Sequence, residues 1–161
     1  MMSQPLAERL RPKTLDDYIG QKHLVGQGAV LRKMIDAGRV PSFILWGPPG
    51  VGKTTLAQII ANKLDAPFYT LSAISSGVKD VREVIEKAKS NRFFNTVSPI
   101  LFIDEIHRFS KSQQDSLLNA VETGVVTLIG ATTENPSFEV IRPLLSRCQV
   151  YVLKSLDKND L

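Results

Sequence analysis

One segment of the chain has the residue types and spacing of a phosphate-binding loop. Residues 47–54 match the pattern G-x-x-x-x-G-K-[ST] at every fixed position, between an apolar run and a helical pattern. The glycines let backbone N–H groups close on phosphate oxygens, and the following helix directs its N-terminus at the same anion. Lys53 is expected to reach the β- and γ-phosphates of ATP, and Thr54 to bind Mg²⁺. The residues predicted to bind the nucleotide here are Gly47, Pro48, Pro49, Gly50, Val51, Gly52, Lys53, Thr54 and Thr55.

A pair of carboxylates follows a second apolar run, at residues 100–103. In open α/β sheets, ligands bind at the carboxyl ends of the strands, where Asp104 and Glu105 would lie. Asp104 is expected to hold Mg²⁺, mostly through water, and Glu105 to polarise the attacking water. The alternative is an acidic strand end that only caps the next turn.

Thr132 lies at the end of another predicted strand, and two interpretations of it stay open. If that strand lies between the strand before the phosphate-binding loop and the strand that ends at Asp104, the Thr132 hydroxyl can position the attacking water. Otherwise it is an ordinary strand-end threonine, which β-propensity favours. His107 is similarly open to a structural or coupling role or to a chemical one.

The elements that must position these residues alternate between strands and helices. Apolar runs predict buried strands, and stripes at helical spacing predict helices. Ser110 and Gln113 form a capping box at the start of one helix. The alternation predicts a parallel, doubly wound α/β sheet. The predicted strands cover 42–46, 67–71, 100–103, 125–131 and 149–153, and the predicted helices cover 27–37, 53–64, 78–89, 110–124 and 139–145.

Composition limits the class of protein. The 161 residues carry 20 basic and 16 acidic side chains, so the net charge of +4 permits a nucleic-acid partner without requiring one. The single cysteine, Cys148, excludes an internal disulfide. No secretory signal pattern and no apolar run of about 20 residues is present, so we expect a cytoplasmic protein without a membrane partner.

The ordered motifs resemble the AAA+ ATPases of the clamp-loader branch, and more narrowly the replication-associated recombination protein A family. The resemblance covers essentially the whole chain. It is carried by residues 5–21, 47–54, 104–109, 130–136 and 146–148. Three features narrow the resemblance to this family among the many P-loop proteins. They are the first of these segments, the His-Arg-Phe sequence after the acidic pair, and the Thr-Thr-Glu-Asn-Pro-Ser sequence.

The resemblance implies a fold and several residue roles. The fold is a P-loop NTPase with a five-stranded parallel sheet of order 5-1-4-3-2 flanked by helices. Thr132 matches the position called sensor 1, and Ser72 matches a polar residue that can hold the catalytic glutamate inactive until DNA binds. Arg147 matches the arginine finger that reaches the γ-phosphate of a neighbouring subunit. The residues that match the segment around the adenine are Arg11, Pro12, Tyr18 and Ile19.

The resemblance also implies a domain organisation. Residues 1–26 would form an N-terminal adenine-side segment and residues 27–161 the AAA+ nucleotide-binding core. Relatives continue into a helical lid and an oligomerisation domain, which this chain is expected to lack. The last residues read as a helix that is cut short, so we expect a piece of a longer protein.

The implied function is that of a DNA-dependent ATPase in replication-fork maintenance and recombination. Its partners would be ATP, single-stranded or forked DNA, neighbouring AAA+ subunits and single-strand DNA-binding protein. Basic residues of the helix at 78–92, such as Lys79 and Arg82, are candidate DNA contacts or simply a solvated face. The alternatives are a clamp-loader subunit, a Holliday-junction branch-migration motor, or an ATP-gated interaction module with little hydrolysis.

Overall fold

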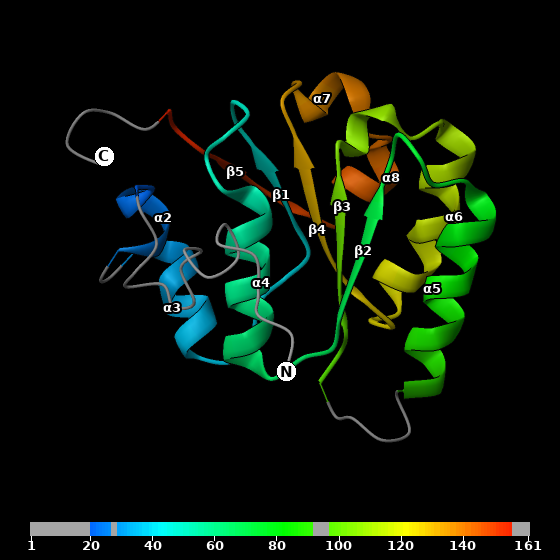
Figure 1. Cartoon of the computed structure of the whole chain (residues 1–161), viewed down its shortest axis with the longest axis horizontal. Helices are drawn as coiled ribbons and strands as arrows, with labels where there is room; N and C mark the ends of the chain where they lie inside the picture. Colours follow the sequence, from blue (N-terminus) through cyan, green and yellow to red (C-terminus); the bar gives the residue numbers. More distant parts are fainter. Residues whose placement is uncertain (1–19, 27–28, 92–96, 156–161) are drawn as a thin grey trace, which may run out of the picture.

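The computed structural model describes residues 20–26, 29–91 and 97–155. Its centre is a sheet of five parallel strands in the spatial order β2-β3-β4-β1-β5 (Figure 1). Read from the other edge, this is the order 5-1-4-3-2, so the predicted fold class is confirmed. The strands are β1 (Phe43–Trp46), β2 (Phe68–Ser72), β3 (Ile100–Asp104), β4 (Thr127–Thr132) and β5 (Gln149–Val152).

Helices cover both faces of the sheet, as Figure 1 shows. One face is covered by α3 and α4, with α2 beside them, and the other by α5, α6 and α8. The short α7 follows the end of β4. The helices are α2 (Lys22–Val25), α3 (Val30–Asp36), α4 (Lys53–Leu64), α5 (Val78–Asn91), α6 (Lys111–Glu122), α7 (Pro136–Glu139) and α8 (Arg142–Leu145), with a 3₁₀ turn, η1, at Ile106–Arg108.

The strands are apolar on both sides because both sides are covered. Along β1, Phe43 and Leu45 pack into the cluster beneath α3 and α4, whereas Ile44 packs into the cluster beneath α5 and α6. Leu101 and Phe102 of β3 divide between the two clusters in the same way. The alternation of side chains along a strand therefore supplies two cores from one set of short apolar runs.

Local signals located several helix boundaries correctly. The helix predicted at 53–64 has those bounds, and Ser110 and Gln113 form both bonds of the capping box at the start of α6. The predicted helix at 139–145 is wrong, because two short helices occupy this region and Val140 and Ile141 between them are extended. A continuous helix would bring the Pro143 ring against the carbonyl of Glu139, so proline is accepted only in the first turn of α8.

The parallel arrangement brings all strand carboxyl ends to one edge of the sheet, the upper edge in Figure 1. β4 pairs with β1 on one side and with β3 on the other. The loop that joins β1 to α4 and the turn that follows β3 therefore flank the end of β4. Within the described ranges, no helix combines the length and the apolar character needed to cross a bilayer.

Candidate nucleotide-binding site

A hollow of about 320 Å³ lies at this carboxyl edge and collects most of the predicted site residues. It joins the β1–α4 loop to the ends of β3 and β4, which are far apart in sequence. Gly47 and Pro48 are not among its lining residues, because they lie at the entrance of the loop from β1. The lining residues are Pro49, Gly50, Val51, Gly52, Lys53, Thr54, Thr55, Asp104, Glu105, Thr132 and Thr133.

The backbone of the loop has the conformation that a phosphate cradle requires. Gly50 and Gly52 have φ values of 79° and 85°, in the left-handed region that glycine enters without a side-chain penalty. The first rung of α4 is the bond from Leu56 N–H to the Gly52 carbonyl. The N–H groups of Lys53, Thr54 and Thr55 precede that rung, so they form the donor end of the helix. An anion in the hollow would face these donors and the positive end of the helix dipole.

Lys53 lies between the cradle and the acidic pair. Its ammonium donates a hydrogen bond of 2.7 Å to the Gly47 carbonyl, which directs the side chain back over its own loop. Burial lowers the pKa of the Lys53 ammonium, and the charges of Asp104 and Glu105 act in the opposite direction. A cation placed between two carboxylates and a phosphate cradle can bridge them when a phosphate arrives.

The two carboxylates occupy different positions at the end of β3. Asp104 ends the strand and is exposed toward the hollow, whereas Glu105 begins the turn with φ of 53°. A left-handed residue other than glycine costs about 1–2 kcal/mol, and such strain is concentrated at functional sites. Glu105 Oε2 lies 3.1 Å from Arg108 Nε, as an ion pair whose angles do not make a hydrogen bond. In the β2–β3 register, Ser72 lies opposite Asp104 and not opposite Glu105. The contact of Ser72 with Glu105 therefore stays a prediction.

Thr132 lies where the conditional prediction required. β4 is between β1 and β3, and the Thr132 side chain is only 2% exposed yet borders the hollow. Its carbonyl accepts the Gly47 N–H at 3.1 Å, and its hydroxyl lies 2.9 Å from His107 Nδ1. The threonine therefore joins the entrance of the cradle to the turn that follows Glu105. Sequence reasoning missed this partner because residues 107 and 132 meet only through the pairing of β3 with β4.

The oxygen atoms at this edge fit a magnesium ion. Thr54 and Asp104 border the same hollow and supply hydroxyl and carboxylate oxygens, which Mg²⁺ prefers. In the part of the chain that the structure describes, no three His, Cys, Asp or Glu side chains form a metal cage. Mg²⁺ usually keeps several waters and completes its shell with substrate phosphates, so two protein ligands suit it.

The end of β5 packs against the entrance of the cradle. A Cβ atom on Gly47 would lie 2.8 Å from both Cβ and O of Leu153, so only glycine fits. The next residue, Lys154, is held by Gln21, whose side chain donates to its carbonyl at 2.6 Å and accepts from its N–H at 2.8 Å. The predicted adenine-side residues precede this anchor and lie outside the described residues: Arg11, Pro12, Tyr18 and Ile19.

Arg147, the predicted arginine finger, lies away from the hollow. Its guanidinium pairs with Glu122 at the end of α6, at 3.5 Å, and both side chains are exposed. The segment that precedes Arg147 in the chain, around Glu139 and Ile141, is held by the buried side-chain amide of Gln114. That amide donates to the carbonyls of Phe109 and Glu139 and accepts from the Ile141 N–H at 2.8 Å. The structure thus separates Arg147 from this chain's own cradle while tying its segment to the turn after Glu105.

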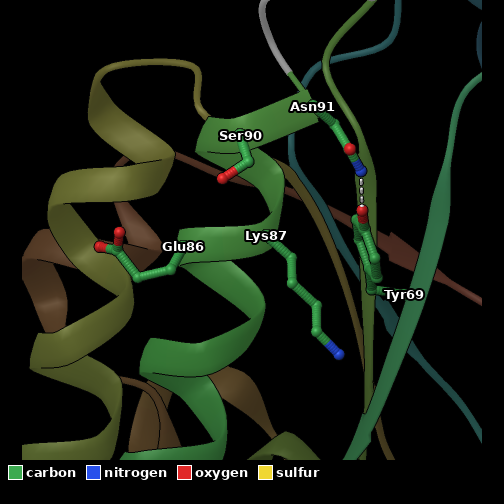
Figure 2. A pocket seen from close by; sticks show the side chains of 5 residues that line it. All are labelled: Tyr69, Glu86, Lys87, Ser90 and Asn91. Atoms are coloured by element: carbon green, nitrogen blue, oxygen red, sulfur yellow. Dashed lines mark hydrogen bonds between the residues drawn. The ribbon is translucent and has the colours of Figure 1, made fainter.

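A second hollow, of about 390 Å³, lies between β2 and α5 and contains none of the predicted site residues. Figure 2 shows the Asn91 amide donating to the Tyr69 hydroxyl, with the Glu86 and Lys87 side chains pointing in different directions. Glu86 pairs instead with Lys89, at 3.4 Å. The groups in this hollow do not converge on a common point, in contrast to those at the strand ends.

Known proteins resemble the chain over most of its length. It is 57% identical over 157 residues to replication-associated recombination protein A of Haemophilus influenzae, covering 98% of this chain and 35% of that protein. It is 54% identical to ATPase WRNIP1 of Dictyostelium discoideum, covering 98% of this chain and 18% of that protein. The chain therefore spans about a third or less of the length of these two relatives.

A solved structure also resembles the chain over most of the chain's length. The Thermotoga maritima RuvB Holliday junction branch migration motor superposes with a TM-score of 0.71 at 34% identity. The match covers 91% of this chain and 48% of that one. Residues 43–156, from β1 to beyond β5, match a single family description. With its cradle, acidic pair and strand order in place, the chain belongs to the ATPase family associated with various cellular activities, AAA.

Proposed function

We propose that the chain is the nucleotide-binding core of a DNA-dependent ATPase that acts in replication-fork maintenance and recombination. The observation that carries this proposal is the convergence of Lys53, Thr54, Asp104, Glu105 and Thr132 on one hollow. These side chains come from α4, from β3 and the turn that follows it, and from β4, and they supply a cation, two carboxylates and two hydroxyls. That set suits hydrolysis of a phosphoanhydride, for which positioning and charge stabilisation are the main requirements.

The proposed reaction is attack of water on the γ-phosphorus of ATP, which releases ADP and phosphate. Glu105 orients the water and accepts its proton, and its strained turn holds the carboxylate at the strand end. Lys53 binds the β- and γ-phosphate oxygens, and the cradle N–H groups bind the remaining phosphate charge. Thr54 and Asp104 would hold Mg²⁺, which would neutralise part of the phosphate charge. Thr132 places its hydroxyl between the γ-phosphate and the water.

Arg147 completes the site of a neighbouring subunit in this proposal. Its side chain is exposed and remote from its own cradle, and its contact with Glu122 is a surface ion pair. Such pairs contribute about 0–1 kcal/mol, so the guanidinium can leave Glu122 for a phosphate at little cost. A planar, permanently charged fork suits that target.

DNA is the proposed activator, together with single-strand DNA-binding protein as a partner and the bacterial cytoplasm as the location. The names of several relatives refer to replication and recombination. Lys79 and Arg82 on α5 are exposed and are the proposed DNA contacts. Contacts of this type act on phosphates, so they should make DNA stimulation dependent on salt.

Three alternative functions would use the same cradle, and a particular observation favours one of them. The RuvB likeness favours a branch-migration motor, and a clamp-loader subunit would use the same site. An ATP-gated interaction module would need the same cradle but little hydrolysis. The presence of Glu105 in a strained, site-facing position counts against that module.

The deciding experiment is ATP hydrolysis by the full-length natural protein that contains this sequence, with no DNA, single-stranded DNA or forked DNA. Binding of ATP by the 161-residue chain is measured in parallel. Binding by the chain together with DNA-stimulated turnover supports the proposal, and loss of stimulation in a Lys79→Ala/Arg82→Ala variant supports the α5 contacts. Binding with negligible turnover on every DNA favours the interaction module, and preferential turnover on four-way junctions favours the branch-migration motor.

A further inference from the structure

Thr132 has a fixed backbone and a buried hydroxyl. Its carbonyl accepts the Gly47 N–H at 3.1 Å, and the residue lies opposite Trp46 in the β1–β4 register, so its backbone is held in the sheet. The side chain is 2% exposed but borders the hollow that holds Lys53 and Glu105. What remains adjustable is the direction in which the hydroxyl proton points.

Three contacts compete for the hydroxyl, which has one proton to donate and two lone pairs to accept. The Glu134 N–H donates to Thr132 Oγ1 at 3.0 Å and uses one lone pair. The Glu134 carbonyl, at 3.2 Å, can only accept the proton. His107 Nδ1, at 2.9 Å, can either donate or accept, depending on the tautomer of the ring.

The tautomer of His107 therefore decides where the Thr132 proton points. If Nδ1 carries no hydrogen, it takes the Thr132 proton, which is then unavailable to a ligand. If Nδ1 carries the hydrogen, it fills the second lone pair and leaves the proton to the longer contact with the Glu134 carbonyl. That longer bond is the one that a phosphate oxygen or an attacking water can replace.

His107 is also linked to the acidic pair. It lies in η1, which follows Glu105 directly, and the neighbouring Ile106 is fully buried. A Cβ atom on Gly130 would lie 3.1 Å from Ile106 Cδ1, so η1 packs directly on β4. The Glu105 turn is therefore continuous with the residue whose ring faces Thr132.

The other histidine gives an internal contrast. His23 Nε2 lies 2.8 Å from the Val152 carbonyl, which can only accept, so that ring nitrogen must carry a hydrogen. The chain has two histidines in all, and one is therefore fixed by its partner while the other faces a partner that can donate or accept.

We propose that His107 is a positioning residue for the Thr132 hydroxyl, and that its tautomer decides whether this hydroxyl can donate to the γ-phosphate or the attacking water. The inference rests on the proposed ATPase function and adds a control within the same site. His107 acts through Thr132 and does not touch the reacting atoms.

Two substitutions that retain an amide separate this role from simple packing. His107→Asn places an amide near the position of Nδ1, whereas His107→Gln places it near that of Nε2. In the full-length natural protein, we expect His107→Asn to keep kcat within about threefold, and His107→Gln and His107→Ala to lose about 10–100-fold, as misplacement of an aligned group does. ATP affinity should change less than about twofold in all three, because the loss belongs to the transition state.

The kinetic test has clear opposing outcomes. Equal kcat for all variants, equal loss in Asn and Gln, or a rise in KM with kcat unchanged would each overturn the inference. Thermal melting of each variant checks folding, and the Asn and Gln pair still decides if His107→Ala unfolds. If the wild-type protein hydrolyses no ATP on any DNA, the proposed function fails by itself.

A measurement on the 161-residue chain tests the inference without turnover. Long-range ¹H–¹⁵N correlation spectra report which nitrogen of each histidine ring carries hydrogen. We expect Thr132→Val and a non-hydrolysable ATP analogue with Mg²⁺ each to change the His107 pattern, with Nδ1 protonation favoured when the analogue binds. His23 should keep hydrogen on Nε2 throughout. An unchanged His107 pattern in both experiments would refute control of Thr132 by the ring.

Discussion

The two halves of the candidate site are built in different ways. The cradle half is one continuous segment, in which backbone N–H groups, two left-handed glycines and the start of α4 surround the phosphate position. The strand-end half consists of Asp104 and Thr132 at the ends of two neighbouring strands and Glu105 in the turn after Asp104. Side-chain contacts join Thr132 to His107 and Glu105 to Arg108. We therefore propose that the first half governs affinity for the nucleotide, whereas the second governs its turnover.

Glu105→Gln tests the strand-end half and should have the largest effect. The amide keeps the shape of the side chain but cannot accept the proton of water, so turnover should fall about 10²–10⁴-fold. ATP affinity should stay within about twofold, measured by titration beside steady-state hydrolysis. Arg108→Gln is the matched control, because it also removes the 3.1 Å ion pair but keeps the carboxylate. An equal loss in both variants would assign the effect to the ion pair.

Lys53→Met tests the cradle half. It removes the cation but keeps most of the side-chain volume, and hydrogen bonds to charged groups contribute about 1.5–3 kcal/mol. ATP affinity should therefore fall about 10–100-fold, measured by calorimetric titration of the 161-residue chain. Lys63→Met, on the last turn of the same helix and exposed, is the control. Unchanged affinity in Lys53→Met would contradict the division of roles between the halves.

Gln114→Leu should destabilise the strand-end half without touching the hollow. The substitution leaves the Phe109 and Glu139 carbonyls and the Ile141 N–H without their side-chain partner. Each of these three groups, left unpaired where water cannot replace the bond, costs about 1–3 kcal/mol, so we expect a total loss of at least about 3 kcal/mol. Urea unfolding measures it, with the exposed Ser112→Ala as control. A loss below about 0.5 kcal/mol, the range of ordinary surface changes, would show that the hydrogen bonds of the Gln114 side chain do not stabilise the fold.

Gly47→Ala should destabilise the cradle half by packing alone. The new Cβ would lie 2.8 Å from the Leu153 carbonyl oxygen, which belongs to backbone and cannot rotate away. Overpacking of this kind costs about 1–3 kcal/mol, measured as a lower urea midpoint. Gly77→Ala is the control, because its Cβ would meet nothing closer than 3.9 Å. Equal stability of the two variants would show that the backbone at the end of β5 moves to accommodate the added methyl group.

The smallest expected effect is a change of stability with pH that arises from the Cys148 thiol. This residue follows Arg147 directly, so its reactivity reports on the segment that carries Arg147. Burial raises the pKa of the Cys148 thiol to about 12, from an ordinary value of 9.0. The folded chain then retains this proton at pH values where the unfolded chain releases it. The resulting stabilisation is complete below pH 9.0 and is lost as the pH rises toward about 12.

Two measurements check this behaviour. Alkylation at about pH 8.5 should be slower in the folded chain than in urea, because the thiolate is the reacting form. The difference in unfolding midpoint between wild type and Cys148→Ala should shrink as the pH is raised above 9.0. Fast alkylation of the folded chain would contradict burial of the thiol. Faster alkylation in the Gln114→Leu variant would show that the hydrogen bonds of Gln114 hold the segment that contains Cys148.

The sequence by itself determined the cradle, the acidic pair and the class of fold. The cradle is local, since its glycines, its lysine and the start of α4 are contiguous, so spacing alone defines the geometry. Apolar runs and helical stripes located all five strands and the long helices to within a few residues. The prediction at 139–145 was wrong because Pro143 lies inside that range, where a continuous helix would bring its ring against the carbonyl of Glu139.

Tertiary structure decided what meets at the end of β4. No spacing rule brings His107 to Thr132, Gln114 to Ile141 or Gln21 to Lys154, because each contact depends on which strands are neighbours and on the packing of loops over their ends. Strand order followed from family resemblance and not from the pattern of residues, since every order of parallel strands has the same alternation of elements. Local chemistry therefore specified the phosphate site, and long-range packing specified the contacts around it.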